Sequence, residues 1–294
     1  MSANTLTSLI PTIYKAADTV AREQVGFIPA VYKDSDLERV ALNQTITYPV
    51  VGTYGPGDIT PAATGPDGSG VTVGNGSMTI TKERSVKIPW TGNEQASIRP
   101  VYQQVLEDQF AQAMRALVNE IETDLFLAAK RGGSRAYGTA GTTPFATAGN
   151  LSDFAETSQI LDDNGTPDTD RQLVLSGASK TKILSVQSSL FKANEAGSTE
   201  MLRNATLGRV EGFDLRHSKQ IVSHTKGTGA SYVFNGSHAA GATTVVAKTG
   251  TGTVLYGDIV TFEDDTTNKY IVNTGIAAAG SMVIGGPGLK QAQT

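Results

Sequence analysis

The chain has 294 residues, no cysteine and a formal net charge of −4, which excludes disulfide bonds, cysteine-ligated zinc and thiol catalysis. Hydrophobic residues make up 39% and charged residues 18% of the sequence, as in folded proteins, whereas 32 glycines and 6% aromatic residues indicate many turns and few large core side chains. The acidic balance argues against a general nucleic-acid-binding protein, which would present a basic face.

The chain is long enough for more than one compact region, and it shows no targeting or membrane segment. The first twenty residues contain no apolar stretch flanked by basic residues, so we expect no signal peptide. No run of about 18 apolar residues is present to span a bilayer. These features predict a protein that is made and folds in a cytosol.

Residues 1–44 are predicted to form an N-terminal arm. A short amphipathic helix is indicated by apolar residues at helical spacing, namely Leu6, Leu9, Ile10, Ile13, Tyr14 and Ala17. A less regular stretch, FIPAVYKDSDLERV, follows it. The pattern leaves open whether the arm folds back on its own chain or lies across a neighbouring molecule.

Residues 45–94 are predicted to form an extended two-stranded ribbon. A short strand, ITYPVV, is followed by the glycine- and proline-rich tract GTYGPGDITPAATGPDGSGVTVGNG and then by SMTITKERSVKIPW, whose residues alternate in character. Such alternation with β-branched residues is typical of a strand. Because an isolated two-stranded ribbon is marginally stable in water, we expect it to pack either on a partner subunit or on its own domain.

A long helix is predicted between Ser97 and Arg131, within a region that spans residues 95–150. Its apolar residues recur in steps of three or four, at Leu106, Phe110, Met114, Leu117, Ile121, Leu125 and Ala128. Ser97 is a suitable N-cap, and Gly132 and Gly133 end the helix after two basic residues. One apolar stripe on an otherwise polar helix predicts packing against a sheet or a neighbouring element.

Residues 151–226 have an α/β character. Residues 151–165 predict an amphipathic helix, residues 171–176 a buried strand, and Ser176 is a good N-cap for the helix that follows. The segment GRVEGFDLRHSKQIV returns as a strand pair or bent strand, with Gly212 at a turn or bulge.

Residues 227–294 contain five short β runs, YVFNG, TTVVAK, VLYGDIVTFE, KYIVN and SMVIGG, separated by glycine, asparagine and aspartate turns. They predict a small all-β module or the strands of a barrel. The whole chain is therefore expected to be an α+β protein.

Two patterns resemble catalytic or binding motifs but lack their defining residues. SGASKT at 176–181 lies where a strand turns into a helix, but the first glycine of a phosphate-binding loop is missing. The acids Asp162, Asp163, Asp168 and Asp170 lack the alternating ligands and the twelfth-position glutamate of a calcium loop. No Gly-x-Ser-x-Gly elbow is present. We therefore predict an ordinary capped helix and a turn, no cofactor, and no enzymatic activity.

The three histidines, His217, His224 and His238, lack the i, i+4 spacing of a metal-binding pair, and the acids near them form no ligand pattern. They are predicted to be surface or loop residues, with no metal site.

Charged residues on the ribbon and on the long helix, together with one tryptophan on the ribbon, are candidates for contacts between subunits. On the helix a solvated face is the simpler interpretation and a surface for a basic partner the alternative, whereas on the ribbon intersubunit pairing is favoured because the ribbon needs support. The candidates are Lys82, Glu83, Arg84, Lys87 and Trp90 on the ribbon, and Glu120, Glu122 and Asp124 on the helix.

The order of these parts resembles that of the major capsid proteins of tailed bacteriophages with the Hong Kong 97-like fold, and more narrowly the gene-product-five coat family of short-tailed phages. The similar stretches are residues 78–131, the segment GRVEGFDLRHS and the turn GDIVTF. In that family the ribbon is an extended loop that lies over the adjacent subunit, and the long helix is the spine of a peripheral domain. The resemblance implies that residues 151–226 form an axial domain and residues 227–294 an inserted β module.

This resemblance implies a protein that self-assembles into hexamers and pentamers of an icosahedral head enclosing double-stranded DNA. Its partners would be further copies of the chain together with scaffolding and portal proteins, and the DNA would be non-specific content. The expected location is the virion capsid, assembled in the bacterial host cytoplasm. Another virion protein, such as a tail-tube or decoration protein, and a nucleotide-binding enzyme that uses residues 176–181 are the alternatives.

Overall fold

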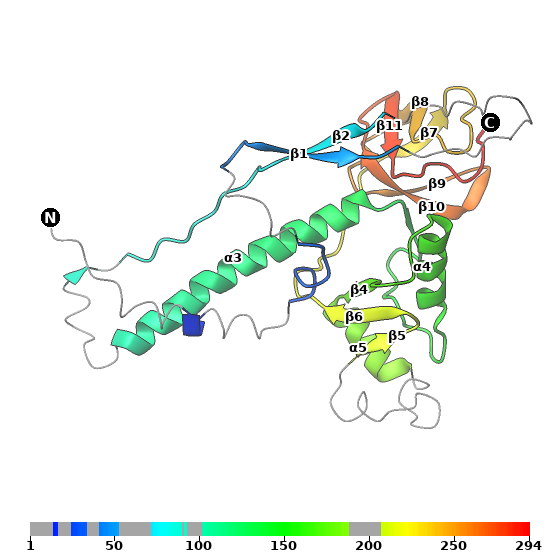
Figure 1. The fold of residues 1–294 in the computed structure, drawn as a ribbon. Coiled ribbons are helices and arrows are strands. Elements are labelled where there is room, and N and C mark those ends of the chain that lie inside the picture. The colour runs from blue at the N-terminus through cyan, green and yellow to red at the C-terminus, as the bar shows by residue number, and fades with distance from the viewer. Residues whose placement is uncertain are drawn as a thin grey trace, which may run out of the picture. The chain divides into compact units, whose positions relative to one another are not determined.

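The computed structural model describes residues 14–16, 25–33, 41–52, 72–89, 91–92, 102–187 and 207–294 (Figure 1). It contains helices together with mainly antiparallel strands, so the fold is α+β, as predicted. The chain divides into two compact units, of which the smaller comprises Lys33–Lys87 and the larger comprises Met1–Tyr32 and Ile88–Thr294.

The smaller unit contains a two-stranded antiparallel ribbon. β1 (Thr45–Val50) pairs with β2 (Gly74–Thr79), and the first residue of β1 lies opposite the last residue of β2. The predicted ribbon is confirmed, but its second strand begins and ends earlier than the alternating stretch at residues 77–90 indicated. Residues 81–89 belong to no strand, because β1 begins at Thr45, whose partner is Thr79, and no other strand in the described ranges pairs with the residues after it.

α3 (Tyr102–Gly132) is the long helix that the sequence predicts, with 31 residues and a length of about 46 Å at 1.5 Å per residue. Lys130 and Arg131 occupy its last turn, where positive charge suits the negative end of the helix dipole. The predicted N-cap, Ser97, lies outside the described residues.

The buried side of α3 differs from the predicted apolar stripe. Leu106 is buried as expected, and so are Ala111, Glu122 and Phe126, whereas Ile121 is 49% exposed. Helical spacing identifies apolar positions, but the elements that pack on the helix decide which of them are covered.

Two described parts of the N-terminal arm, around Ala16 and around Phe27, lie against α3. Ala16 packs on Ala111, and the ring of Phe27 lies 5.9 Å from the ring of Phe126. Of the two arrangements that the sequence left open, the arm folds back on its own chain at these residues.

The α/β region has the predicted order of elements, which are α4 (Ser152–Asp163), β4 (Gln172–Leu175), α5 (Gly177–Val186), β5 (Arg209–Val210) and β6 (Phe213–His217). β4 and β6 pair in parallel, and β5 pairs antiparallel with β6. Gly212, with φ 86°, lies in the tight turn between β5 and β6, which confirms the predicted turn. The core of this region includes Phe154, Leu175, Ile183 and Phe213.

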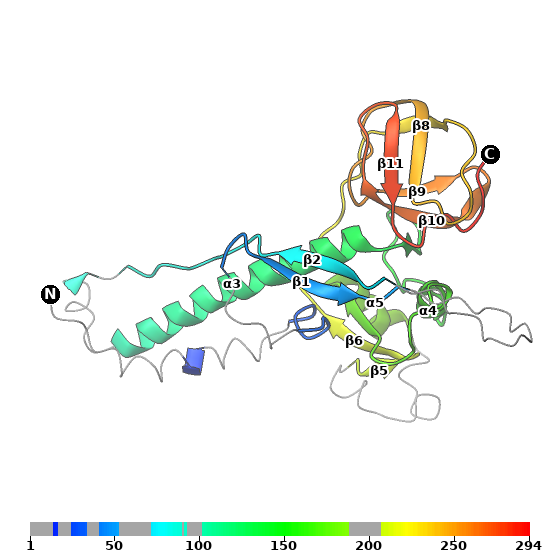
Figure 2. The ribbon, with the colours of Figure 1, turned by 45° about the horizontal axis from the view of Figure 1, so that its top comes forward.

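The C-terminal region is an antiparallel β module whose strands curl around one core (Figure 2). Its strands are β7 (Ala230–Phe234), β8 (Thr244–Thr251), β9 (Ile259–Phe262), β10 (Asp265–Thr274) and β11 (Gly280–Ile284), in agreement with the five predicted β runs. The short strand β3 (Arg135–Ala136), which follows α3, pairs with β10. The predicted boundary at residue 227 therefore omits one strand of this sheet.

Candidate functional site

The charged candidates on the ribbon are exposed. Lys82, Glu83, Arg84 and Lys87 all lie in the stretch that follows β2, and each is exposed to solvent. Trp90 lies outside the described residues. The participation of these side chains in contacts between subunits stays a prediction.

The ribbon itself buries little of its surface. All residues of β1 and β2 are exposed except Ile46 and Gly76, which are half-buried. Apolar side chains are among the exposed ones, since Tyr48 is 46%, Val50 47% and Met78 49% exposed. A two-stranded ribbon without a covered face lacks the burial that stabilises a sheet. This surface is therefore the strongest candidate for contact with another molecule.

Glu122 on α3 is buried, with 2% of its surface exposed, so the interpretation that places it on a solvated face is wrong. Its carboxylate accepts hydrogen bonds from the backbone N–H groups of Gly26, Phe27 and Ile28, at 3.2, 3.0 and 2.7 Å. The hydroxyl of Ser218, just after β6, donates a fourth hydrogen bond at 2.8 Å. One carboxylate thus joins the arm, the long helix and the α/β region inside the protomer.

The charge of Glu122 is stabilised by these donors. Burial raises the pKa of this carboxyl group, but the hydrogen bonds from Ile28, Phe27, Ser218 and Gly26 outweigh it, and the pKa is lowered from its ordinary value. Backbone N–H groups that cannot reach water need an acceptor, and a carboxylate can accept several at once.

A sequence signal for this role did exist. Val118 and Phe126 stand four residues to either side of Glu122 and lie on the same helix face. An acid within an apolar stripe predicts a buried, hydrogen-bonded carboxylate. By contrast, Glu120 and Asp124 are half-buried, and their predicted contact with another subunit stays a prediction.

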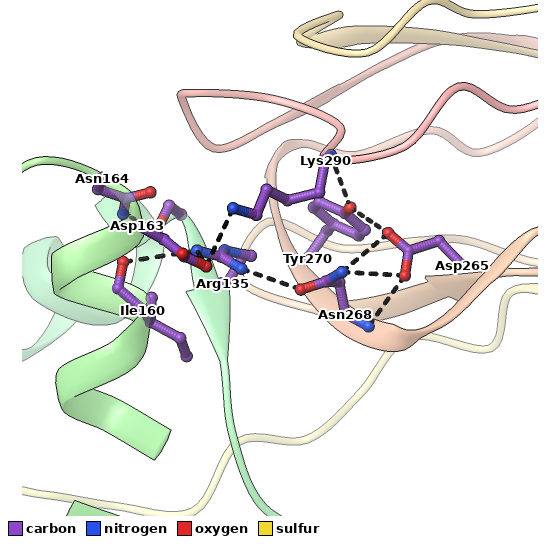
Figure 3. A network of polar contacts seen from close by, with 9 residues as sticks. Arg135, Ile160, Asp163, Asn164, Asp265, Asn268, Tyr270 and Lys290 are labelled. Carbon is purple, nitrogen blue, oxygen red and sulfur yellow. Dashed lines mark hydrogen bonds and ion pairs between the residues drawn. The ribbon is translucent and has the colours of Figure 1, made fainter. Parts of the chain in front are cut away.

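A polar network joins α4 to the β module (Figure 3). The guanidinium of Arg135, in β3, forms an ion pair of 2.8 Å with Asp163 at the end of α4 and donates a hydrogen bond of 2.9 Å to Asn268 in β10. The ammonium of Lys290 lies 3.0 Å from the same Asp163 carboxylate. The hydrogen bond from Arg135 is the main cause of the lowered pKa of Asp163, and the hydrogen bond from Lys290 adds to it.

The network continues into the core of the β module (Figure 3). Asn268 donates to the buried carboxylate of Asp265, and the hydroxyl of Tyr270 donates to it at 2.6 Å. The same hydroxyl accepts the backbone N–H of Lys290 at 2.9 Å. Burial and the bond to Asp265 raise the pKa of Tyr270 to about 12. These contacts connect the end of α4 with β3 and β10.

The acidic loop after α4 binds an arginine. The guanidinium of Arg171, only 6% exposed, lies 2.6 Å from the carboxylate of Asp162 and 2.8 Å from that of Asp168. Gly165, with φ 72°, forms the turn between them. This confirms the prediction of a turn, and among the residues that the structure describes no group of His, Asp or Glu is arranged to hold a metal ion.

The histidines occupy three different environments, and the prediction of surface or loop positions is wrong for His217. His217 lies half-buried in β6, where burial and the charge of Lys180 lower its pKa. His224 lies between Lys130 and Asp258, at 2.6 Å from each. The Nε2 atom of His238 accepts the backbone N–H of residue 246.

The turn at residues 176–181 is an ordinary capped helix start, as predicted. The Ser176 hydroxyl oxygen accepts the backbone N–H of Ser179 at 3.2 Å. The Thr181 hydroxyl donates to the carbonyl of Gly177 at 2.9 Å. Both hydroxyl groups are therefore used within the helix.

Comparisons with known proteins add little to this geometry. No family model matches the chain, and no curated protein matches its sequence. A solved structure from Mycobacterium phage Che8 is similar over 90% of this chain and 96% of that chain, with 13% sequence identity and a TM-score of 0.47. Among the helices that the structure describes, none has the length and apolar character needed to cross a membrane.

Proposed function

We propose that this chain is a major capsid protein of a tailed bacteriophage, with a Hong Kong 97-like arrangement of its parts. It would self-assemble into hexamers and pentamers of an icosahedral head that encloses double-stranded DNA. The order of a two-stranded ribbon, a helix of 31 residues, an α/β region and a β module supports the proposal. In this role the chain is not an enzyme and requires no cofactor.

The ribbon is the observation on which the proposal depends. It belongs to a separate compact unit of the chain, and its strands leave nearly all their residues exposed. Such a ribbon must be stabilised by contacts outside itself, because a two-stranded ribbon alone buries too little apolar surface and packing on another surface buries more. In a shell, that surface belongs to a neighbouring copy of the same chain.

The charge of the chain suits a container for DNA. Affinity for nucleic acid grows with the number of Lys and Arg contacts to phosphate, whereas this chain has 24 basic and 28 acidic residues. The packaged DNA would thus be non-specific content. Scaffolding and portal proteins would be the other partners, the assembled protein would reside in the virion, and assembly would take place in the host cytoplasm.

The proposal is tested by expressing the chain and examining it by negative-stain microscopy and sedimentation. We expect capsomers or closed, similarly sized particles. Tubes, or binding only to preformed shells, would instead favour a tail-tube or a decoration protein. A chain that remains a monomer at all concentrations, with or without a scaffolding protein, would refute self-assembly.

A ribbon variant makes this test specific. Residues 51–73 are replaced by Asn-Gly, which suits a two-residue hairpin turn between the paired residues Val50 and Gly74. We expect this variant to fold and to remain soluble but not to form shells. A control in which residues 53–71 are replaced by a glycine/serine segment of equal length separates the effect of length from that of sequence. Normal shells from the Asn-Gly variant would show that the ribbon is dispensable.

A further inference from the structure

Three strands of the β-module sheet have an unpaired edge among the described residues, namely β7, β9 and the two-residue strand β3. β7 pairs only with β8, and β9 pairs only with β10. A cavity of about 550 Å³ is lined by residues of both strands. We call this opening between β7 and β9 the seam. Its volume lies within the range of about 300–1,000 Å³ that is usual for sites that hold a ligand.

The walls of the seam are apolar. Tyr232 and Phe234 come from β7, Val260 and Phe262 from β9, and Met282 lies among the lining residues. Tyr232, Phe234 and Val260 are only half-buried, although they pack on the core of the module. Apolar walls beside two unpaired strand edges are a surface that another strand can cover, since its backbone pairs with an edge while alternate side chains enter the pocket.

A buried polar atom also lacks a partner at the seam. The side chain of Gln293, which lines the cavity, is completely buried. Its Nε2 atom donates to the carbonyl of Gln291 at 3.1 Å, but its Oε1 atom has no hydrogen-bond partner among the described residues. A buried acceptor without a donor costs stability. An N–H group entering the seam would satisfy it.

A stretch of this same chain has the complementary properties. Residues 80–88 alternate as a strand does, yet the described structure assigns none of them to a strand. Val86, 44% exposed, and Ile88 are two positions apart and so point to the same face of an extended chain. Lys87 lies between them and faces the opposite way.

The charges of the two surfaces are also complementary. The stretch holds three basic side chains, Lys82, Arg84 and Lys87, and one acid. Two acids, Glu263 and Asp264, are exposed at the end of β9 and line the seam. Opposite charges at the rim of an interface fix its register and favour the correct partner.

We infer that the seam between β7 and β9 binds residues 80–88 of a second copy of this chain. Val86 and Ile88 enter the cavity, and Lys87, on the opposite face of the stretch, lies near Glu263 at the end of β9. The inference rests on the proposed self-assembly and names the surface that one copy offers to the next. Because the two contact surfaces differ, the contact is head-to-tail and can close into a ring.

Engineered disulfide bonds test the inference directly, because the natural chain has no cysteine. The test variant combines Lys87→Cys with Thr261→Cys, because Thr261 lies between the core-facing Val260 and Phe262 on β9 and so faces outward, as Lys87 does in the inferred contact. The control combines Lys87→Cys with Ser281→Cys, which is also exposed but lies on β11, a strand with a neighbour on each side. Both are oxidised after assembly and separated by non-reducing electrophoresis.

We expect a ladder of covalent oligomers from the test variant and at least ten times less cross-linking in the control. A disulfide bond within single chains, seen as a fast-migrating monomer, would show that the seam is filled by its own protomer and would overturn the inference. Equal ladders in both variants would also overturn it, because the contact would then be unspecific.

Microscopy of the same samples separates this inference from the proposed function. Particles without a ladder of covalent oligomers would support self-assembly and would refute the seam as the contact between copies. If no particles form and the chain is monomeric, both are rejected. As a second measurement, Lys87→Glu should slow assembly several-fold and Glu263→Lys in the same chain should restore it. A double variant no faster than Lys87→Glu alone would contradict the charge pairing.

Discussion

Replacing Glu122 by alanine tests the role of its buried carboxylate. The substitution removes the acceptor of four hydrogen bonds, three of them from the backbone at residues 26–28 and one from Ser218. A buried donor without an acceptor costs about 1–3 kcal/mol. Allowing for partial relaxation, we expect Glu122→Ala to lower the free energy of unfolding by about 3–5 kcal/mol, as when a buried charged contact is broken.

Glu122→Gln is the conservative counterpart. The amide oxygen can replace one carboxylate oxygen, but the amide nitrogen then faces an N–H group and cannot accept a hydrogen bond from it. With the carboxylate atom Oε2 accepting three of the bonds and Oε1 the one from Ile28, the amide oxygen is best placed at the position of Oε2. One unsatisfied donor and the lost charge then cost about 2 kcal/mol.

The loss of stability in Glu122→Ala should depend on pH in a defined direction. The pKa of Glu122 is lowered in the folded protein from its ordinary value of 4.5. A lowered pKa stabilises the folded state above the unfolded-state pKa, and this stabilisation is lost as the pH falls through the folded-state pKa. The difference between wild type and Glu122→Ala should thus be largest near neutral pH and should shrink in acid.

Urea unfolding of the unassembled protein, followed by circular dichroism, measures these differences. Asp108→Ala is the matched control, because Asp108 is exposed on the same helix, and a surface substitution of this kind changes stability by no more than about 0.5 kcal/mol. If Glu122→Ala cost no more than the control, the carboxylate would not be joining the arm to the helix, and the reasoning would be refuted.

Three further predictions concern other residues of the larger unit. Arg135→Met should lower the free energy of unfolding by about 2–4 kcal/mol, because the Arg135 side chain is only 5% exposed and its ion pair is lost. Lys290→Ala should lower it by less than about 1 kcal/mol, because the Lys290 side chain is 39% exposed. A smaller loss for Arg135→Met than for Lys290→Ala in thermal unfolding would contradict this. Tyr270 should ionise near its raised pKa of about 12, so its stabilising effect is present below the ordinary value and lost as the pH rises; spectroscopic titration should show one late tyrosine that Tyr270→Phe removes, and a titration unchanged by that variant would disprove it. Ser176→Ala should cost about 1 kcal/mol as a lost N-cap, and calorimetry should find no ATP or GTP binding; binding that disappears in Lys180→Ala would revive the nucleotide-enzyme alternative.

Local patterns predicted most of the elements. The long helix, the capped helix after Ser176 and the five β runs are all found near their predicted positions. Helical periodicity, a capping serine and alternation with turn residues act within a few neighbouring residues, so they can be read without knowing the fold. The second ribbon strand lies earlier in the chain than predicted, because alternation shows only that a stretch can form a strand, whereas pairing requires a partner strand.

The contacts of Glu122 and Arg135 could not be assigned from the sequence in the same way. The partners of Glu122 lie 94 to 96 residues away along the chain, and Arg135 meets Asn268 across 133 residues. No local rule connects residues at such distances. Charge and the need of the ribbon for support predict its contact residues, and the assembly experiments test that prediction.

The sequence by itself determined the kinds of element, their order, the caps and turns, and the absence of cysteine chemistry, because these depend on composition and on neighbours along the chain. Only the tertiary structure decided which face of the long helix is covered, that an acid on that helix accepts hydrogen bonds from the arm, and that β7 and β9 each have an unpaired edge among the described residues. These depend on which distant segments meet, because burial and hydrogen-bond partners belong to the packed chain and not to any one stretch of it.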